Sequence, residues 1–472
     1  MSEGWEAREQ GKTRASRARL IAYDVCREVR QRNAFTHNVL DARLAHEFGL
    51  TPEDRSFAIA LALGVTQTAG TLDEVIDGVL DNPRDLRPDV RDALRISAYE
   101  VLFLDKDPYA AVDQGVELVR SFNPKAKGFA NAVLRRIVRA KRDFPFGDPE
   151  TDLAACARLR GFPLWLAELL VQTLGKEAAQ EFMATSNDPA PVYFAVNSAK
   201  ATCEEVFKTL ASAGADPEAV DVCGREVEGC YLLRNSRALA DGRVRHLLQT
   251  GSVLVSDAAS QRIAELAVQT AYASKSRDAS EPVRFLEIGA GRATKTILLQ
   301  SGSRRMFGRY LDMTCVDNQE FKVNLLRKRI AEFGLPSACA LTADATKLAE
   351  HLGEDPSFDA VFLDAPCTGI GTLRRHPEIR WRVDEDAIRE SSALQLALLE
   401  SAAAQVLPGG VLVYATCTVT RDENVGVVKR FLETELGSRF RVAPVEGRPV
   451  FATSLVRGGC DAHFAVRMVR LS

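Results

Sequence analysis

The stretch AVFLDAPC occupies residues 360–367, and a second stretch of similar form, VLVYATC, occupies residues 411–417. Each begins with a short apolar run of the kind that forms a buried parallel strand, and each ends in a cysteine just beyond that run. In an open α/β sheet, ligands bind beyond the carboxyl ends of the strands. We therefore expect Cys367 and Cys417 to meet in one cleft, although they are far apart in the sequence.

The sequence from residue 283 onward alternates between strand-like runs and helical segments. The predicted strands are 283–288, 313–316, 339–342, 360–363, 411–415 and 464–469, and the predicted helices are 319–333, 387–406 and 424–435. Such alternation is typical of a parallel, doubly wound sheet covered by helices. Residues 251–472 are therefore predicted to form an α/β domain.

The N-terminal part of the chain, residues 14–143, has the apolar spacing of helices and no strand-like alternation. Thr51 offers a hydroxyl cap to a helix that has Pro52 at its first position and an acid at its third. Further helices are predicted at 88–104, 109–122 and 126–141. These patterns predict an all-α domain.

Residues 150–250 are predicted to form a small α+β domain between these two. A proline-bounded stretch, 145–149, has the composition of a linker. Strands are predicted at 192–197 and 230–233, and Thr202 is placed to cap a helix between them.

Composition places the protein among soluble, multidomain chains. It has 472 residues, of which 46% are hydrophobic and 26% charged. No apolar run approaches the roughly 18 residues that a membrane helix needs, and residues 1–8 do not resemble a signal peptide. The ten cysteines are scattered without CxxC spacing, which is typical of reduced thiols rather than of disulfides or a metal site. We therefore expect a cytoplasmic protein without a metal.

The net charge of −3 does not indicate nucleic-acid binding, but the local charge does. One stretch contains eight basic residues and no acid: Arg120, Lys125, Lys127, Arg135, Arg136, Arg139, Lys141 and Arg142. A second cluster consists of Arg374, Arg375, Arg380 and Arg382. Basic patches on a neutral protein are typical of phosphate contacts, and Arg374, Arg375 and Arg380 are candidates for them. The alternative for both stretches is a solvated helix face with ion pairs.

The stretch FLEIGAG, residues 285–291, predicts a strand that runs into a glycine turn. Glycines let a ligand approach the backbone closely, and a helix start beyond them offers unpaired N–H groups. The pattern alone would also fit a nicotinamide site or a simple tight turn. Asp317, Asp344 and Asp364 each follow a predicted strand, so three carboxylates are expected at one edge of the sheet, where acids in nucleotide-binding folds hold ribose hydroxyls.

The segments DAPC (364–367), RRHPEIRW (374–381), YATC (414–417) and EN (423–424) occur together in this order. Through them the chain closely resembles the RsmB/Sun family of bacterial ribosomal RNA 5-methylcytosine methyltransferases, and the resemblance covers nearly the whole chain. It implies a Rossmann-like class I methyltransferase domain, an RNA-recognition-like α+β subdomain before it, and S-adenosylmethionine as cofactor. It also implies small-subunit (16S) ribosomal RNA as partner. We expect the enzyme to be a monomer.

The N-terminal part of the chain also resembles this family. EDR (53–55), DALRISAY (92–99) and KGFANAVLRR (127–136) are similar to segments of the NusB-type RNA-binding domain that opens proteins of this family. The resemblance makes the basic stretch between Arg120 and Arg142 a candidate RNA contact. Arg95 and Asn131, taken singly, are more simply interpreted as helix-packing residues.

The resemblance also implies which residues carry the reaction. It makes Cys417 the nucleophile and Cys367 the residue that assists product release. It implies that the cofactor is bound by the glycine loop and the three acids: Gly289, Ala290, Gly291, Arg292, Ala293, Thr294, Lys295, Asp317, Asp344 and Asp364. The loop EIGAGRATKT, residues 287–296, departs from the family's DLCAAPGGKT and instead resembles the glycine motif of other S-adenosylmethionine-dependent methyltransferases.

The chemistry implied is covalent catalysis. Cytosine C5 is a poor nucleophile until a thiolate adds to C6, and elimination of the thiol after loss of the C5 proton restores the ring. The same chemistry on transfer RNA or another RNA is an alternative. A non-catalytic RNA-binding or assembly factor with an altered cofactor loop is another, and a dehydrogenase is the least supported because no hydride-transfer site is evident.

Overall fold

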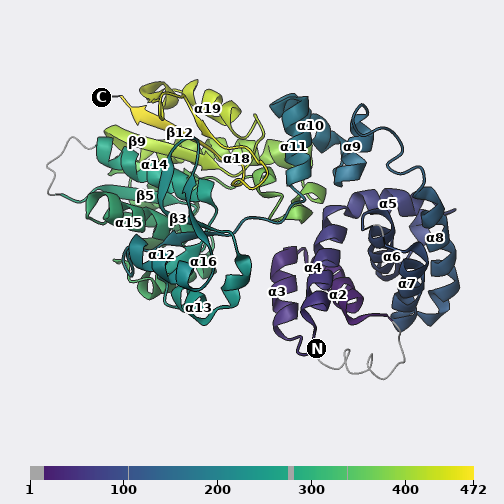
Figure 1. Ribbon diagram of the computed structural model, residues 1–472. Coiled ribbons are helices and arrows are strands. Elements are labelled where there is room, and N and C mark those ends of the chain that lie inside the picture. The colour runs from purple at the N-terminus through teal and green to yellow at the C-terminus, as the bar shows by residue number, and fades with distance from the viewer. Residues whose placement is uncertain (1–14, 105, 275–280, 337, 472) are drawn as a thin grey trace. The chain divides into compact units, whose positions relative to one another are not determined.

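The computed structural model describes residues 15–104, 106–274, 281–336 and 338–471 (Figure 1). The first eight residues and the predicted domain start at residue 14 lie outside the described part. Contacts divide the chain into two compact units. The N-terminal unit comprises Met1–Asp188 and Leu373–Val383, and the C-terminal unit comprises Pro189–Thr372 and Asp384–Ser472. Among the described residues, no helix is long and apolar enough to cross a membrane.

The N-terminal unit is built of helices in its described residues, as predicted. They are α2 (Arg17–Arg32), α3 (Thr36–Ala45), α4 (Pro52–Gln67), α5 (Ala69–Gly78), η1 (Pro83–Asp85), α6 (Pro88–Leu102), α7 (Pro108–Phe122), η2 (Pro124–Ala126), α8 (Lys127–Ala140), α9 (Leu153–Arg160), α10 (Leu164–Leu174) and α11 (Lys176–Thr185). The predicted cap is present at α4, where the Thr51 hydroxyl accepts a hydrogen bond from the Asp54 N–H at 3.1 Å. Such a cap satisfies one of the N–H groups that a helix start leaves without a partner.

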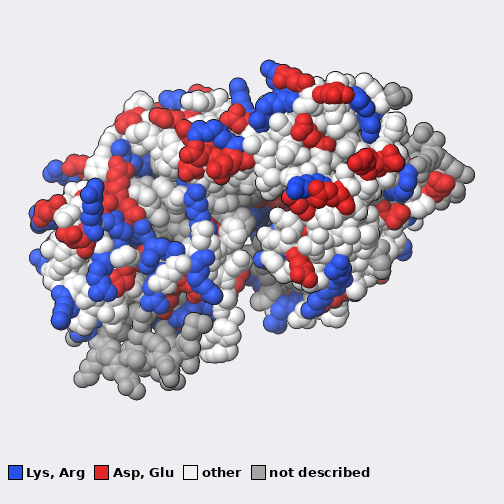
Figure 2. Space-filling view, turned by 180° about the vertical axis from the view of Figure 1, so that it is seen from behind, with Lys and Arg blue, Asp and Glu red and all other residues white. Residues whose placement is uncertain are grey.

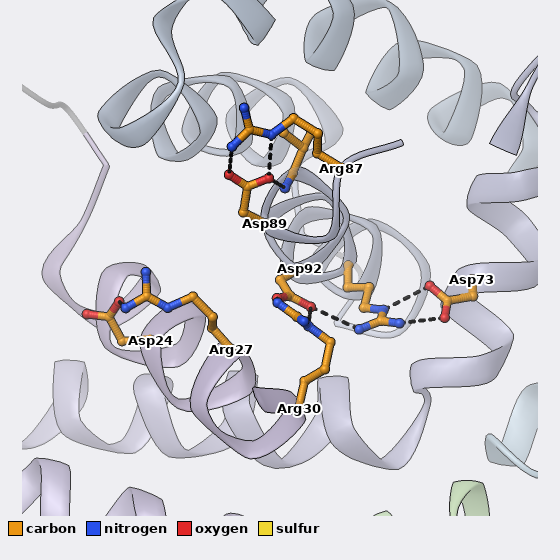
Figure 3. Close-up of polar contacts among 9 residues, drawn as sticks. Asp24, Arg27, Arg30, Asp73, Arg87, Asp89 and Asp92 are labelled. Carbon is orange, nitrogen blue, oxygen red and sulfur yellow. Dashed lines mark hydrogen bonds and ion pairs between the residues drawn. The ribbon is translucent and has the colours of Figure 1, made fainter. Parts of the chain in front are cut away.

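Charged side chains in the N-terminal unit are paired across helices. Asp92 on α6 is buried and accepts hydrogen bonds from Arg30 of α2 at 2.8 Å and from Arg95 at 3.0 Å (Figure 3). Arg95 also contacts the Asp73 carboxylate of α5 at 2.5 Å. A buried carboxylate requires such partners because water no longer solvates it. Arg95 is therefore a helix-packing residue, as its simpler interpretation predicted.

The segment Leu373–Val383 belongs to the N-terminal unit, although its neighbours in sequence on both sides belong to the other. It contains the short helix η6 (Pro377–Trp381). The Trp381 indole N–H donates to the Thr66 carbonyl at 3.0 Å. Its ring lies so close to α5 that a Cβ added to Gly70 would be 2.2 Å from it. The indole thus occupies the space that a larger residue at position 70 would fill.

Arg380 in this segment is fully buried. Its guanidinium lies 4.3 Å from the Phe162 ring centroid and donates to the Gly161 carbonyl at 3.2 Å and to Asn187 Oδ1 at 2.9 Å. Burial lowers the pKa of Arg380 to about 9. Arg374 is buried too. The prediction that these two arginines contact RNA phosphate is therefore wrong, because a phosphate cannot reach side chains that are enclosed by protein.

The C-terminal unit contains two sheets. The smaller has the strand order β2-β3-β1-β4 and is antiparallel throughout. Its strands are β1 (Tyr193–Val196), β2 (Pro217–Asp221), β3 (Glu226–Leu233) and β4 (Val253–Val255), and its helices are α12 (Cys203–Ser212), η3 (Ser236–Ala240) and α13 (Gly242–Gln249). Thr202 and Glu205 form the predicted cap of α12 by bonding to each other's backbone N–H. The expected α+β character of this region is confirmed.

The larger sheet has the order β10-β12-β9-β8-β5-β6-β7, and β11 pairs with β12. Its strands are β5 (Arg284–Ile288), β6 (Asp312–Asp317), β7 (Cys339–Thr342), β8 (Phe358–Asp364), β9 (Val406–Thr416), β10 (Phe440–Val442), β11 (Phe451–Ala452) and β12 (Phe464–Arg470). The strands β5 to β9 are parallel, as predicted. The expectation that the last strand is parallel is wrong, because β12 runs antiparallel to β9. The sheet is therefore mixed.

Helices cover both faces of this sheet (Figure 1). They are α14 (Ala258–Ser274), α15 (Thr294–Phe307), α16 (Glu320–Glu332), α17 (Ala349–Leu352), α18 (Glu385–Ala404) and α19 (Val425–Leu432). Alternate strand residues enter separate cores: Phe285 and Phe362 pack with residues of α14 to α16, whereas Leu286 and Leu363 pack with residues of α18 and α19. Continuous apolar strands follow from burial on both faces, and they leave the strand ends as the accessible edge.

Candidate active site

The two cysteines meet beyond the ends of β8 and β9. The Cys367 and Cys417 Sγ atoms are 3.2 Å apart, and the Cys417 backbone N–H donates to the Cys367 sulfur at 3.3 Å. Both are free and half-buried. The predicted meeting of the two thiols is confirmed, because adjacent parallel strands end at the same edge. Their roles in a reaction stay predictions.

The chemical state of Cys367 follows from its surroundings. Its pKa is raised well above the ordinary value, first by its hydrogen bond with the Cys417 side chain and then by burial. Cys367 therefore retains its proton at neutral pH. A protonated thiol beside a second sulfur provides a weak hydrogen-bond donor to it.

Gly371 fixes the loop that carries Cys367. Its N–H donates to the Cys417 carbonyl at 3.0 Å, and its own carbonyl accepts from the Ala462 N–H at 3.0 Å. A Cβ at this position would lie 2.0 Å from the Ala462 carbonyl oxygen. Only glycine allows the Cys367 loop to lie so close to the end of β9 and the start of β12.

A cavity of about 280 Å³ lies at the ends of β5, β6 and β8. Five of the predicted cofactor residues line it: Gly289, Gly291, Asp317, Asp344 and Asp364. Asn318, Lys322, Thr346 and Leu394 also line it, and the sequence motifs did not indicate them. The first three lie within five residues of Asp317 or Asp344, so proximity in sequence was the signal that could have found them.

The other predicted cofactor residues are not among the residues that line the cavity. They are Ala290, Arg292, Ala293, Thr294 and Lys295. Lys295 contacts the Asp364 carboxylate at 3.0 Å. Ala293 has a positive φ of 70° and precedes α15, which begins at Thr294. The Arg292 carbonyl accepts a hydrogen bond from Arg329, and the Ala290 N–H donates to the Val316 carbonyl. These contacts fix the conformation of the glycine loop.

The glycine loop packs against the backbone of Asp364 and is hydrogen-bonded to Asp317. Gly289 has a φ of 84°, and a Cβ there would lie 2.4 Å from the Asp364 carbonyl oxygen. One Asp317 carboxylate oxygen accepts from the Gly291 N–H and the other from the Gln319 N–H, both at 3.0 Å. The backbone N–H groups thus orient Asp317 toward the cavity edge, with Lys322 at 3.6 Å.

Comparison with known proteins follows the same three-part division. The sequence model of the NusB family matches residues 16–139, that of the RsmF/B-like ferredoxin-like domain matches residues 162–227, and that described as 16S rRNA methyltransferase RsmB/F matches residues 275–448. The first match lies within the N-terminal unit, and the second runs from residue 162, just before α10, to residue 227 in β3 of the smaller sheet.

Relatives resemble the chain over almost its whole length. The "Putative methyltransferase MT1451" of Mycobacterium tuberculosis (strain CDC 1551 / Oshkosh) is 31% identical over 96% of this chain and 97% of that protein. The ribosomal RNA small subunit methyltransferase B of Thermus thermophilus is 29% identical over 97% and 99%. The crystal structure of PH0851 has the same fold, with a TM-score of 0.77 and 22% identity over 97% of this chain and 100% of that one. The chain therefore belongs to the RsmB/F methyltransferase family.

Proposed function

We propose that the protein is an S-adenosylmethionine-dependent RNA cytosine-C5 methyltransferase that acts on small-subunit (16S) ribosomal RNA. The observation that carries this proposal is the pair of thiols, Cys367 and Cys417, whose sulfurs are 3.2 Å apart at the strand ends. A Cys–C6 adduct requires a thiol nucleophile, and its removal requires a second group beside it. The name of the Thermus relative supports ribosomal RNA as substrate.

The residues at the strand ends fit the proposed cofactor. The cavity carries a glycine backbone at Gly289 and Gly291 and carboxylates at Asp317 and Asp344. Carboxylates at this place bind ribose hydroxyls in nucleotide-binding α/β folds, and glycines allow close approach. We propose that these residues and Asp364 hold S-adenosylmethionine, and that the loop Ala290 to Lys295 shapes the site.

The proposed reaction uses the two cysteines in sequence. The Cys417 thiolate forms a bond to C6 of cytosine, and the electron pair moves to C5. The electron pair on C5 takes up the methyl group that S-adenosylmethionine would supply, as the methyl–sulfonium bond breaks and S-adenosylhomocysteine is left. Water then takes the C5 proton, the electron pair of the C5–H bond re-forms the C5–C6 double bond, and the Cys417 thiolate leaves from C6 with the assistance of Cys367. The target base must be unpaired or extruded to reach the thiols.

We propose that the N-terminal unit contributes an RNA-binding surface on α7 and α8. A hollow of about 810 Å³ there is lined by Tyr109, Lys127, Asn131, Arg135 and Arg139, among others. Tyr109 is 88% exposed, so its ring is open to a stacked base. In the view of Figure 2, Lys and Arg side chains gather over the N-terminal unit with acids between them. The domain boundaries 14–143, 150–250 and 251–472 belong to the same proposal.

The decisive test is methyl transfer from labelled S-adenosylmethionine to unmodified small-subunit ribosomal RNA, with the product mapped for 5-methylcytosine. We expect one modified cytosine with wild-type protein and none with Cys417→Ala. Transfer to transfer RNA alone would change the substrate and retain the chemistry. RNA binding without transfer to either RNA would support the alternative of a non-catalytic assembly factor.

A further inference from the structure

Glu423 lies in the loop before α19 and has no role in the reaction described so far. Its side chain is fully buried, and the threonines around it are buried as well. One carboxylate oxygen accepts from the Thr368 N–H at 2.8 Å, and the other accepts from the Thr368 hydroxyl at 2.6 Å. The second oxygen also accepts from the hydroxyls of Thr420 at 2.7 Å and Thr418 at 3.3 Å. Thr368 directly follows Cys367, and Thr418 directly follows Cys417.

Two further side chains complete this connection. Gln395 of α18 donates its amide N–H groups to the Glu423 carboxylate at 3.1 Å and to the Pro366 carbonyl at 2.9 Å. The Tyr414 hydroxyl donates to the Glu423 backbone carbonyl at 2.6 Å. The Glu423 carboxylate thus binds Thr368 directly and Pro366 through Gln395, and these two residues flank Cys367. The same carboxylate binds Thr418 and Thr420 in the loop after Cys417.

We infer that Glu423 is the positioning residue of the two-cysteine site, because its carboxylate holds the loops of Cys367 and Cys417 together. This inference rests on the proposed function. The distance between two sulfurs decides whether one thiol can assist release of an adduct on the other, and small misplacements of reacting groups reduce rates strongly.

The charge of Glu423 has a second consequence for Cys367. The ionisable groups around Cys367 are Cys417, just beyond the end of β9, Glu423, and Tyr414 within β9. The hydrogen bond with Cys417 and burial raise the pKa of Cys367 most, and the negative charge of Glu423 raises it further. Glu423 therefore helps to keep Cys367 protonated, which a residue that served packing alone would not do.

The test compares Glu423→Gln, which has the same shape without the charge, with Glu423→Asp, which keeps the charge at a shorter reach. Glu435→Gln removes the same charge from an exposed side chain of the same unit and is the matched control. Alkylation of Cys367 and Cys417 by iodoacetamide is followed across pH by peptide mass spectrometry, which reports each cysteine separately. Methyl transfer is measured in parallel as kcat and KM for RNA.

We expect Glu423→Gln to shift the alkylation midpoint of Cys367 to lower pH and to reduce kcat about 10- to 100-fold with little change in KM. Glu423→Asp should keep the wild-type midpoint and still lose kcat, and Glu435→Gln should match wild type in both. A Glu423→Gln protein with wild-type midpoint and kcat would overturn the inference.

A second variant and a second readout complete the test. If Glu423→Gln does not fold, Thr420→Val removes one hydrogen bond to the carboxylate and keeps its charge. That variant should lose kcat several-fold at an unchanged midpoint, and unchanged kcat would contradict the inference. If wild-type protein methylates no RNA, the proposed function fails, and the alkylation of Cys367 alone decides whether Glu423 controls this thiol.

Discussion

Glu287 is a carboxyl group inside the C-terminal unit, one residue before the end of β5. It is fully buried, and its Oε2 accepts a hydrogen bond from the Thr296 hydroxyl at 2.6 Å. Burial raises its pKa from an ordinary 4.5 to about 7. Below pH 4 the carboxyl is protonated in both the folded and the unfolded protein, so it does not change the pH dependence of stability there. Between pH 4.5 and 7 only the unfolded protein loses the proton, and stability therefore falls as pH rises.

We expect Glu287→Gln to remove this dependence while keeping an oxygen that accepts from Thr296. The shift corresponds to about 3 kcal/mol of unfolding free energy between pH 4.5 and 7. The variant should therefore gain stability relative to wild type as pH rises from 4.5 to 8, as measured by urea unfolding at both values. If the free energies of unfolding of the two proteins differ by the same amount at pH 4.5 and at pH 8, the raised pKa of Glu287 in the folded protein is contradicted.

Cys367 and Cys417 are in contact, so substitutions can separate their proposed roles. We expect Cys367→Ser to form the adduct through Cys417 but to release product slowly, because the second thiol is gone. A protein–RNA adduct should then accumulate and persist in a denaturing gel, whereas Cys417→Ala should give none. An adduct with Cys417→Ser and none with Cys367→Ser would reverse the two roles.

At the scale of elements, the contact of η6 with α5 depends on a glycine. A Cβ at Gly70 would be 2.2 Å from the Trp381 ring, whereas Gly78 of the same helix has nothing within 4 Å. We expect Gly70→Ala to destabilise the N-terminal unit by about 1–3 kcal/mol, because the indole must shift. Gly78→Ala is the matched control and should be neutral or stabilising by about 0.5–1 kcal/mol.

Hydrogen exchange of the α4 and α5 amides measures both variants without requiring the whole chain to unfold as one unit. Protection lost in Gly70→Ala and retained in Gly78→Ala is the expected result. Equal protection in the two proteins would show that Trp381 does not constrain α5.

The basic face of α8 permits a prediction about RNA binding. Arg135 and Arg139 are exposed and line the hollow beside α7, and neither makes an ion pair with a described residue. We expect Arg135→Gln/Arg139→Gln to weaken RNA binding and to reduce the slope of log K against log salt by about 1.4, since each phosphate contact on a single strand contributes about 0.7. The double variant Lys208→Gln/Lys328→Gln removes two exposed charges from the C-terminal unit and should leave the slope unchanged. An unchanged slope in the arginine variant would place the RNA elsewhere.

At the scale of the whole molecule, local patterns predicted most elements. The strand β7, Cys339–Thr342, has the predicted bounds, and the caps at Thr51 and Thr202 form as their spacing indicated. The reason is that apolar periodicity and capping act within a few residues, so the sequence itself contains the interaction. The meeting of Cys367 and Cys417 was predictable because the carboxyl ends of parallel strands lie at one edge of a sheet. That their strands β8 and β9 are direct neighbours came from the tertiary structure.

Sequence patterns alone predicted the helical N-terminal part, the alternation of strands and helices from residue 283 onward, the edge at which the thiols lie and the resemblance to the family. They did not predict the short strands β2, β10 and β11. Three features became evident only in the folded protein: β12 runs antiparallel, Arg380 is buried in the N-terminal unit, and Glu423 connects the two cysteine loops. These features depend on contacts between residues far apart in the chain. The sequence shows the identity of a charged residue but not its environment. The same glutamate or arginine can be solvated or buried against a partner, and only the packing of distant segments distinguishes the two cases.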